Sequence, residues 1–271
     1  MTLSFPPFTR AVKIIIIINV AIFFFLLIGN LVVSGLQSIA VGWFGLIPGF
    51  VTHGFIWQLV TYAFLHAGIL HILFNMLGLW MFGSQFEMDW GSKQFVEFYL
   101  FCVIGAALVT VAVSYTGFMG VTPLIPTVGA SGGIYGILMA YGMLYGNREV
   151  FMFPLPFMIK AKYMVGIIIL LLLASTLTPG PTGVANFAHL GGLIFGFLYV
   201  KFLPRRGLQY AASEQFYGAR NWYQRWKRRR AARKFEVYMR KHDRAEFFDE
   251  YGNYKPPDKK DGESGRGPWV N

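Results

Sequence analysis

Five polar side chains with catalytic potential stand in otherwise apolar stretches of the sequence: His66, His71, Asn75, Ser131 and His189. Polar groups inside a membrane-spanning run are costly, so each one needs a physical reason. Ser131 lies in the segment GASGGIYG, whose lack of bulk leaves room for a peptide backbone. His189 lies in AHLGG and could take a proton from a serine on a closely packed helix. The two residues therefore suggest a nucleophile and its base.

Each of these signals also has a purely structural interpretation. Gly129/Gly133 and Gly132/Gly136 are small residues at four-residue spacing, which is typical of helix packing in membranes. A lone histidine inside a span is often a packing or proton-path residue. Gly192 and Gly196 would permit close approach of the His189 helix to a neighbour, and we expect that neighbour to be the helix that carries Gly132 and Gly136.

His71 and Asn75 are four residues apart, so they share one helical face. They could form a helix-packing hydrogen bond, or both could donate to a developing oxyanion. A metal site is a third alternative, disfavoured because no cysteine or carboxylate lies in the outer half of any predicted span. If Ser131 begins a helix, the free backbone N–H groups of the first turn and the positive end of the helix dipole lie beside it. These groups could also stabilise an oxyanion.

The composition predicts a membrane protein with a basic tail. Apolar residues make up 55% of the 271 positions and charged residues 14%, against roughly 25% charged in soluble domains. Residues 1–202 contain only seven Lys or Arg and four acids, whereas residues 203–271 contain seventeen and nine. A body this poor in charge could not cover a water-facing surface. We expect two parts, a membrane domain over 1–203 and a cytoplasmic tail over 204–271.

Apolar runs predict six membrane spans, and the first is too long for a signal-peptide core, so we expect it to be retained. Basic residues occur in alternate connections only, which predicts that both termini lie in the cytoplasm. The fourth span has about 15 residues, or ~22 Å, so one end must stop inside the membrane. The long aromatic connection at 34–56 carries no charge and is expected at the outer interface. The predicted spans are 14–33, 69–86, 94–115, 131–146, 162–178 and 185–202.

These residues together resemble the rhomboid family of intramembrane serine proteases. The resemblance covers about residues 10–202 and rests on three motifs in the family's order. These motifs are His66-x4-His71-x3-Asn75, Gly129-Ala130-Ser131-Gly132-Gly133-x2-Gly136 and Ala188-His189-x2-Gly192.

The resemblance implies an all-α fold, a six-helix transmembrane bundle with a short fourth helix and a water-filled cavity open to the outside. It implies that Ser131 attacks a scissile carbonyl and that His189 takes its proton. His71, Asn75 and the backbone N–H of Ser131 would hold the oxyanion. Gly129 would keep the backbone open, and His66 would be a supporting residue.

One departure from the family pattern concerns the first loop. Many members have Trp-Arg where this chain has Trp57-Gln58, which puts the stability of the loop in question more than the chemistry.

The resemblance implies transmembrane proteins as substrates, no cofactor and no metal, and residence in a bacterial inner membrane. Substrates should need helix-weakening residues near the cut, because a helix hides its carbonyls in its own hydrogen bonds. A catalytically silent chaperone or binding module of the same fold is the alternative, and intact Ser131 and His189 count against it. A small transporter would need intramembrane charges or an inverted repeat, and the sequence contains neither.

The tail is expected to be partly helical, then disordered from about residue 255. Residues 205–244 carry thirteen basic side chains and three acids, interleaved with Trp and Tyr. Such a segment could bind nucleic acid, or could be a solvated helix. Because it would be tethered at the cytoplasmic membrane surface, we expect it to bind anionic lipid headgroups and no nucleic acid.

Overall fold

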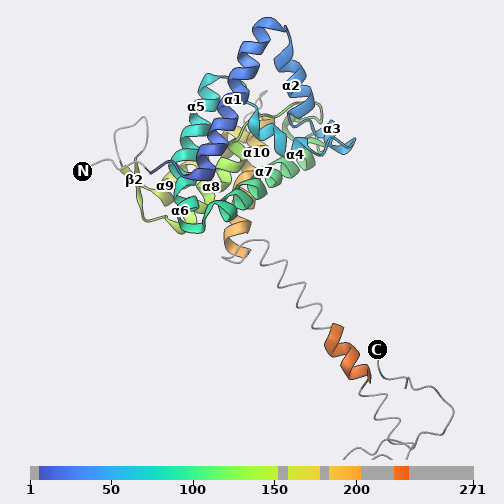
Figure 1. Cartoon of the computed structure of the whole chain (residues 1–271), viewed down its shortest axis with the longest axis vertical. Coiled ribbons are helices and arrows are strands. Elements are labelled where there is room, and N and C mark those ends of the chain that lie inside the picture. Colours follow the sequence, from blue (N-terminus) through green and yellow to red (C-terminus); the bar gives the residue numbers. More distant parts are fainter. Residues whose placement is uncertain (1–5, 152–157, 178–182, 203–222, 232–271) are drawn as a thin grey trace, which may run out of the picture. The chain divides into compact units, whose positions relative to one another are not determined.

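The first part of the chain forms a helical bundle, shown in Figure 1. A computed structural model describes residues 6–151, 158–177, 183–202 and 223–231. Contacts divide the chain into two units, residues 1–211 and 212–271. The helices are α1 (Arg10–Val32), α2 (Leu36–Phe44), α3 (Pro48–Thr52), α4 (Gln58–Thr61), α5 (Ile69–Gly78), α6 (Ser84–Trp90), α7 (Ser92–Ser114), α8 (Ser131–Leu144), α9 (Ala161–Thr176) and α10 (Gly183–Phe202). The remaining elements are the short helices η1 (Tyr62–Phe64), η2 (Leu79–Gly83) and η3 (Phe118–Gly120) and the strands β1 (Glu149–Phe151) and β2 (Met158–Lys160).

The predicted membrane bundle is confirmed. Within the described residues, four helical runs are long and apolar enough to cross a membrane: α1, α7, α10 and the continuous run from α5 to α6. Helices α8 and α9 are shorter and also apolar. Helix α8 has 14 residues, which at 1.5 Å per residue gives about 21 Å, less than a hydrocarbon core. Large apolar side chains are exposed on the outer helices, for example Phe25 at 70% and Leu171 at 64%. Such a surface suits lipid as its solvent.

The second span is not a uniform α-helix. Helices α5 and α6 are joined by η2, a π-helical turn over Leu79–Gly83. Gly83 lies against neighbouring side chains, because a Cβ built on it would be 3.1 Å from Phe95 Cζ and 3.3 Å from Val12 Cγ2. The apolar pattern alone does not predict the extra residue in this turn.

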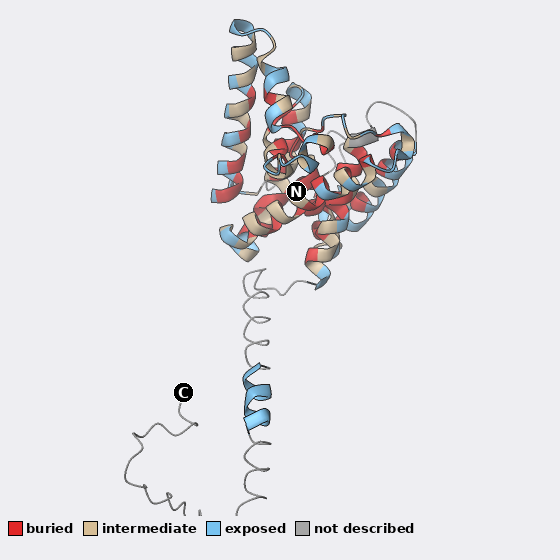
Figure 2. Cartoon of the chain, turned by 90° about the vertical axis from the view of Figure 1, so that its right-hand side faces the viewer, coloured by how far each residue is buried: buried red, intermediate tan, exposed pale blue. Residues whose placement is uncertain are grey.

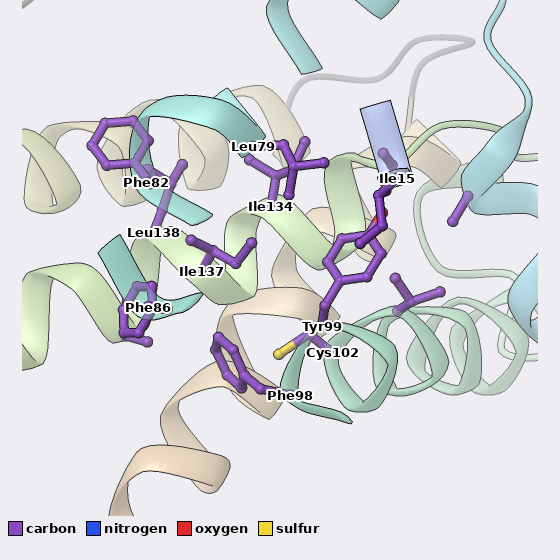
Figure 3. Close-up of a cluster of buried hydrophobic side chains, with 14 of the residues drawn as sticks. Ile15, Leu79, Phe82, Phe86, Phe98, Tyr99, Cys102, Ile134, Ile137 and Leu138 are labelled. Carbon is purple, nitrogen blue, oxygen red and sulfur yellow. The ribbon is translucent and has the colours of Figure 1, made fainter. Parts of the chain in front are cut away.

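Helix α8 lies inside the bundle, where it contacts α7, α9, α10 and η2. Figure 2 shows the buried residues concentrated where these helices meet. In Figure 3, Ile134 of α8 lies beside Leu79 of η2. On its α7 side, a Cβ on Gly136 of α8 would overlap Cys102 Sγ. Tyr99, Cys102 and Ile137 are at most 1% exposed. The helix that carries Ser131 is therefore held on several sides by packed apolar side chains.

The connection after α1 contains short helices instead of the expected loop. The fully buried side chain of Gln58 forms hydrogen bonds to this connection. The Gln58 side chain accepts a hydrogen bond from Ile47 N at 3.0 Å and donates to Gly42 O at 3.0 Å and Trp43 O at 3.3 Å. Trp57 Nε1 also donates to Trp43 O, at 2.9 Å. The Trp57-Gln58 pair thus contacts this segment through four hydrogen bonds, all of them to backbone groups.

A buried carboxylate holds the start of α1. Glu87, 5% exposed, accepts hydrogen bonds from Ala11 N at 2.7 Å and Val12 N at 2.9 Å. The hydroxyl groups of Thr9 and Ser92 donate to it as well, each at 2.5 Å. The first N–H groups of a helix have no partner within the helix, so Glu87 caps α1 from a distant part of the chain.

Two short paired strands, which were not predicted from the sequence, follow α8. β1 and β2 pair antiparallel with Glu149 opposite Lys160. The expected disorder beyond residue 255 and most of the connection at 178–184 lie outside the described residues. Within the tail, residues 223–231 form a helix whose side chains are all exposed.

Candidate active site

Ser131 and His189 meet between two helices. Ser131 is the first residue of α8, and His189 lies in α10. The Ser131 Oγ and His189 Nε2 atoms are 2.8 Å apart, within hydrogen-bonding distance. This separation suits proton transfer from the hydroxyl group to the ring, the geometry expected of a nucleophile and its base.

Glycines allow the two helices to approach this closely. A Cβ on Gly192 would overlap Gly132 O, and a Cβ on Gly196 would overlap Gly136 O. The predicted contact between these two glycine pairs is thereby confirmed. Small residues let helix backbones touch in membranes, and here they bring α10 against α8 just below Ser131 and His189.

The His189 ring is oriented by an aromatic neighbour that sequence reasoning did not single out. Tyr135 stacks on it, with ring centroids 4.2 Å apart and an angle of 8° between the planes. Tyr135 is four residues after Ser131, so it lies on the same face of α8, one turn further along. The four-residue spacing from Ser131 is the feature of the sequence that could have identified Tyr135, because a large ring one turn from a nucleophile can support its base.

His71 and Asn75 are brought to the same place from α5. A Cβ built on Gly129 would lie 2.6 Å from His71 Nε2 and 3.6 Å from Asn75 Nδ2. Gly129 has φ +124°, a conformation that favours glycine, and its N–H donates to Tyr62 O at 2.9 Å. Both side-chain nitrogens therefore lie beside the backbone that leads into Ser131, where only a glycine leaves them space.

The two α5 side chains have hydrogen-bond donors available on this side. His71 Nδ1 is 3.5 Å from Ala67 N, a weak contact in which the ring nitrogen accepts. A neutral imidazole that accepts at Nδ1 carries its proton at Nε2, the atom beside Gly129. Asn75 is 7% exposed, and its Nδ2 has no hydrogen-bond partner among the described residues. An acceptor placed near Gly129 would satisfy both donors.

His66 contacts this group through His71. It precedes α5, is 5% exposed, and packs against His71 with ring centroids 5.1 Å apart. Neither of its ring nitrogens has a hydrogen-bond partner within the described part of the chain. Burial lowers the pKa of His66 from 6.5 to about 4, and the adjacent His71 contributes to the shift. A neutral ring packed behind His71 fits a supporting position.

Over the described ranges, no group of three or more His, Cys, Asp or Glu side chains could hold a metal ion. The site is instead assembled from neutral side chains on α5, α8 and α10, together with the backbone at residues 129–131.

Comparison with known proteins identifies the fold. A family model described as the rhomboid domain matches residues 53–206. The rhomboid protease GluP of Bacillus subtilis (strain 168) is 33% identical over 150 residues, covering 54% of this chain and 26% of GluP. RHOMBOID-like protein 1 of Arabidopsis thaliana is 31% identical over 150 residues, covering 53% of this chain and 33% of that protein.

A further relative is the rhomboid protease GlpG of Yersinia pestis (strain Pestoides F), which is 29% identical over 143 residues. That match covers 53% of this chain and 46% of GlpG, so the chain spans less than half the length of each of these three relatives. The matched domain contains α5 to α10, with every residue of the site described above. The chain is an integral membrane protein that belongs to the rhomboid family.

Proposed function

We propose that this chain is an intramembrane serine protease that hydrolyses peptide bonds in or beside transmembrane helices of other proteins. The observation that carries the proposal is the 2.8 Å contact between Ser131 Oγ and His189 Nε2 at the start of α8. Two relatives are named rhomboid proteases, which supports the same reaction class.

In the first half of the reaction, Ser131 Oγ forms a bond to the scissile carbonyl carbon and passes its proton to His189 Nε2. The oxyanion accepts hydrogen bonds from His71 Nε2–H, Asn75 Nδ2–H and the backbone N–H of Ser131. The C–N bond then breaks, and the leaving amine takes the proton from His189. A water molecule attacks the resulting ester, gives a proton to His189 and releases the carboxylic acid, while Ser131 recovers its proton.

Labelling with a fluorophosphonate tests whether Ser131 is activated. We expect the wild-type protein to be labelled, Ser131→Ala to be unlabelled and His189→Ala to react far more slowly, because nucleophile and base act as one unit. Ser38→Ala is the matched control, since it removes an exposed serine hydroxyl, and its labelling should equal wild type. Wild-type protein that stays unlabelled while folded would favour the catalytically silent chaperone.

We also propose, independently, that residues 205–244, most of which lie outside the described residues, bind anionic lipid headgroups, and that the chain resides in a bacterial inner membrane with both termini in the cytoplasm. Each Lys or Arg near an anionic membrane surface is worth about 1 kcal/mol. In the described helix at 223–231, Arg230 lies 5.3 Å from the centre of the Trp226 ring. A peptide of residues 205–244 should bind anionic liposomes more tightly than neutral ones, and equal binding would refute the proposal.

A further inference from the structure

An apolar groove lies on the side of α1 that faces α2. It has a volume of about 420 Å³, within the range of roughly 300–1,000 Å³ that small-molecule sites occupy. The wall formed by α1 includes Ile18, Ile22 and Phe25, and the opposite wall includes Ala40 and Phe44 of α2.

The groove offers nothing to a polar occupant. Among the described lining residues, Thr61 alone is polar, and its hydroxyl already donates to Phe44 O at 2.7 Å and contacts Trp57 O at 3.1 Å. None of the described residues that line the groove is charged. A water molecule needs two to four polar partners to be held in a cavity, and this lining does not supply them. The occupant must therefore be apolar.

The position of the groove indicates where that occupant comes from. Helices α1 and α2 are joined at one end, where a Cβ on Gly29 would be 2.6 Å from Leu36 Cδ2 and Gln37 N donates to Asn30 Oδ1 at 3.3 Å. From that junction the two helices diverge, as Figure 1 shows, and the groove lies between them. Its rim residues Phe25 and Phe44 are 70% and 49% exposed, so it opens sideways into the membrane.

We propose that this groove binds one acyl chain of a membrane lipid, from the leaflet remote from Arg10 and Lys13. A chain lying between α1 and α2 would fill a space that packed side chains leave open and would hold the α2–α4 segment against the first span. Residues 34–56 and 117–128 contain no charged side chain, so binding should depend on the chain and not on headgroup charge. The proposal does not depend on proteolysis and applies equally to Ser131→Ala protein.

The test uses the full chain in nanodiscs that contain phosphatidylcholine with a photoreactive group on its acyl chain. We expect label to concentrate on the peptides that carry Ile22 and Phe44. Ala40→Leu fills the groove from a side chain that is 8% exposed and should reduce this label several-fold. Ala21→Leu is the matched control, because it makes the same change at an exposed α1 position outside the groove lining.

A second variant guards against misfolding of Ala40→Leu. Phe25→Ala removes an exposed rim residue and should also lower the label, with thermal unfolding unchanged. Phosphatidylglycerol carrying the same photoreactive chain should label the same peptides equally. Label spread evenly over exposed positions such as Leu31 and Leu171 would show only surrounding lipid and would overturn the proposal. Cross-links from the groove to a second protein chain, or label unaffected by Ala40→Leu, would overturn it too.

Discussion

The carbonyl oxygen of Gly132 occupies the space that a side chain on Gly192 would need. This contact sets how closely α10 can approach α8, and Ser131 and His189 lie one residue before and three residues before these glycines. The separation between Ser131 Oγ and His189 Nε2 is therefore controlled by backbone packing.

Gly192→Ala should separate the two helices. We expect at least a tenfold loss of cleavage and a loss of about 1–3 kcal/mol in the free energy of unfolding, as for other overpacked cores. Gly166→Ala in α9 is the matched control, because a Cβ there meets nothing within 4 Å. The control should keep full activity, and a Gly192→Ala enzyme as active as the control would contradict this role of the glycine contact.

Gly129→Ala should remove activity by displacing the oxyanion donors. The new Cβ would lie 2.6 Å from His71 Nε2, in addition to the strain of φ +124°. Losing one oxyanion donor typically costs ~10²–10³ in rate, so a loss of that size or larger is expected in a cleavage assay. Gly91→Ala is the control for backbone strain. Gly91 also has a positive φ, +82°, but nothing lies within 4 Å of its Cβ position. Equal losses in both variants would assign the effect to strain alone.

Glu87→Gln should destabilise the protein through α1. The amide replaces one acceptor oxygen with a donor, which leaves buried N–H or O–H groups unpaired at a cost of about 1–3 kcal/mol. Thermal unfolding in detergent measures the change. Glu149→Gln makes the same substitution at an exposed strand residue and is expected to stay within about 0.5 kcal/mol of wild type. Unfolding temperatures that are the same for both variants would refute the capping role.

His66 should make the folded protein less stable in acid. Its pKa is about 4 in the folded state and 6.5 when unfolded, so the unfolded chain binds more protons between these values. The His66 contribution to stability is therefore constant above pH 7 and declines as the pH falls from about 6.5 towards 4. His66→Gln should weaken the fall in unfolding temperature between pH 7 and pH 5. A His66→Gln curve parallel to wild type would contradict the prediction.

Much of the fold could be predicted because apolar runs report directly on helices that cross a membrane. The start of the fourth helix at Ser131 was predicted to the residue, and the glycine spacing predicted its contact with α10. The π-turn at Leu79–Gly83 was not predicted, because the apolar pattern of that span fits an uninterrupted α-helix equally well. The role of Gln58 was missed because its partners are backbone groups, which have no sequence signature.

The site itself was predictable only as a set of residue types. Spacing put His71 and Asn75 on one face, but their approach to Gly129 depends on how α5 meets the segment before α8. Tyr135 was passed over because an aromatic residue in an apolar helix is usually core. Its stacking on His189 requires the angle between α8 and α10 that only the packed bundle defines.

Cleavage of a single-span substrate in proteoliposomes tests the role of Ser131 most directly. The substrate should carry a helix-weakening residue in its span, and mass spectrometry of the products should locate the cut. Wild-type protein is predicted to cut in or beside the span. Ser131→Ala is predicted to show no cleavage above background at an unchanged unfolding temperature, because a single hydroxyl contributes little to packing. Cleavage by Ser131→Ala at the wild-type rate would contradict the assignment of Ser131 as the nucleophile.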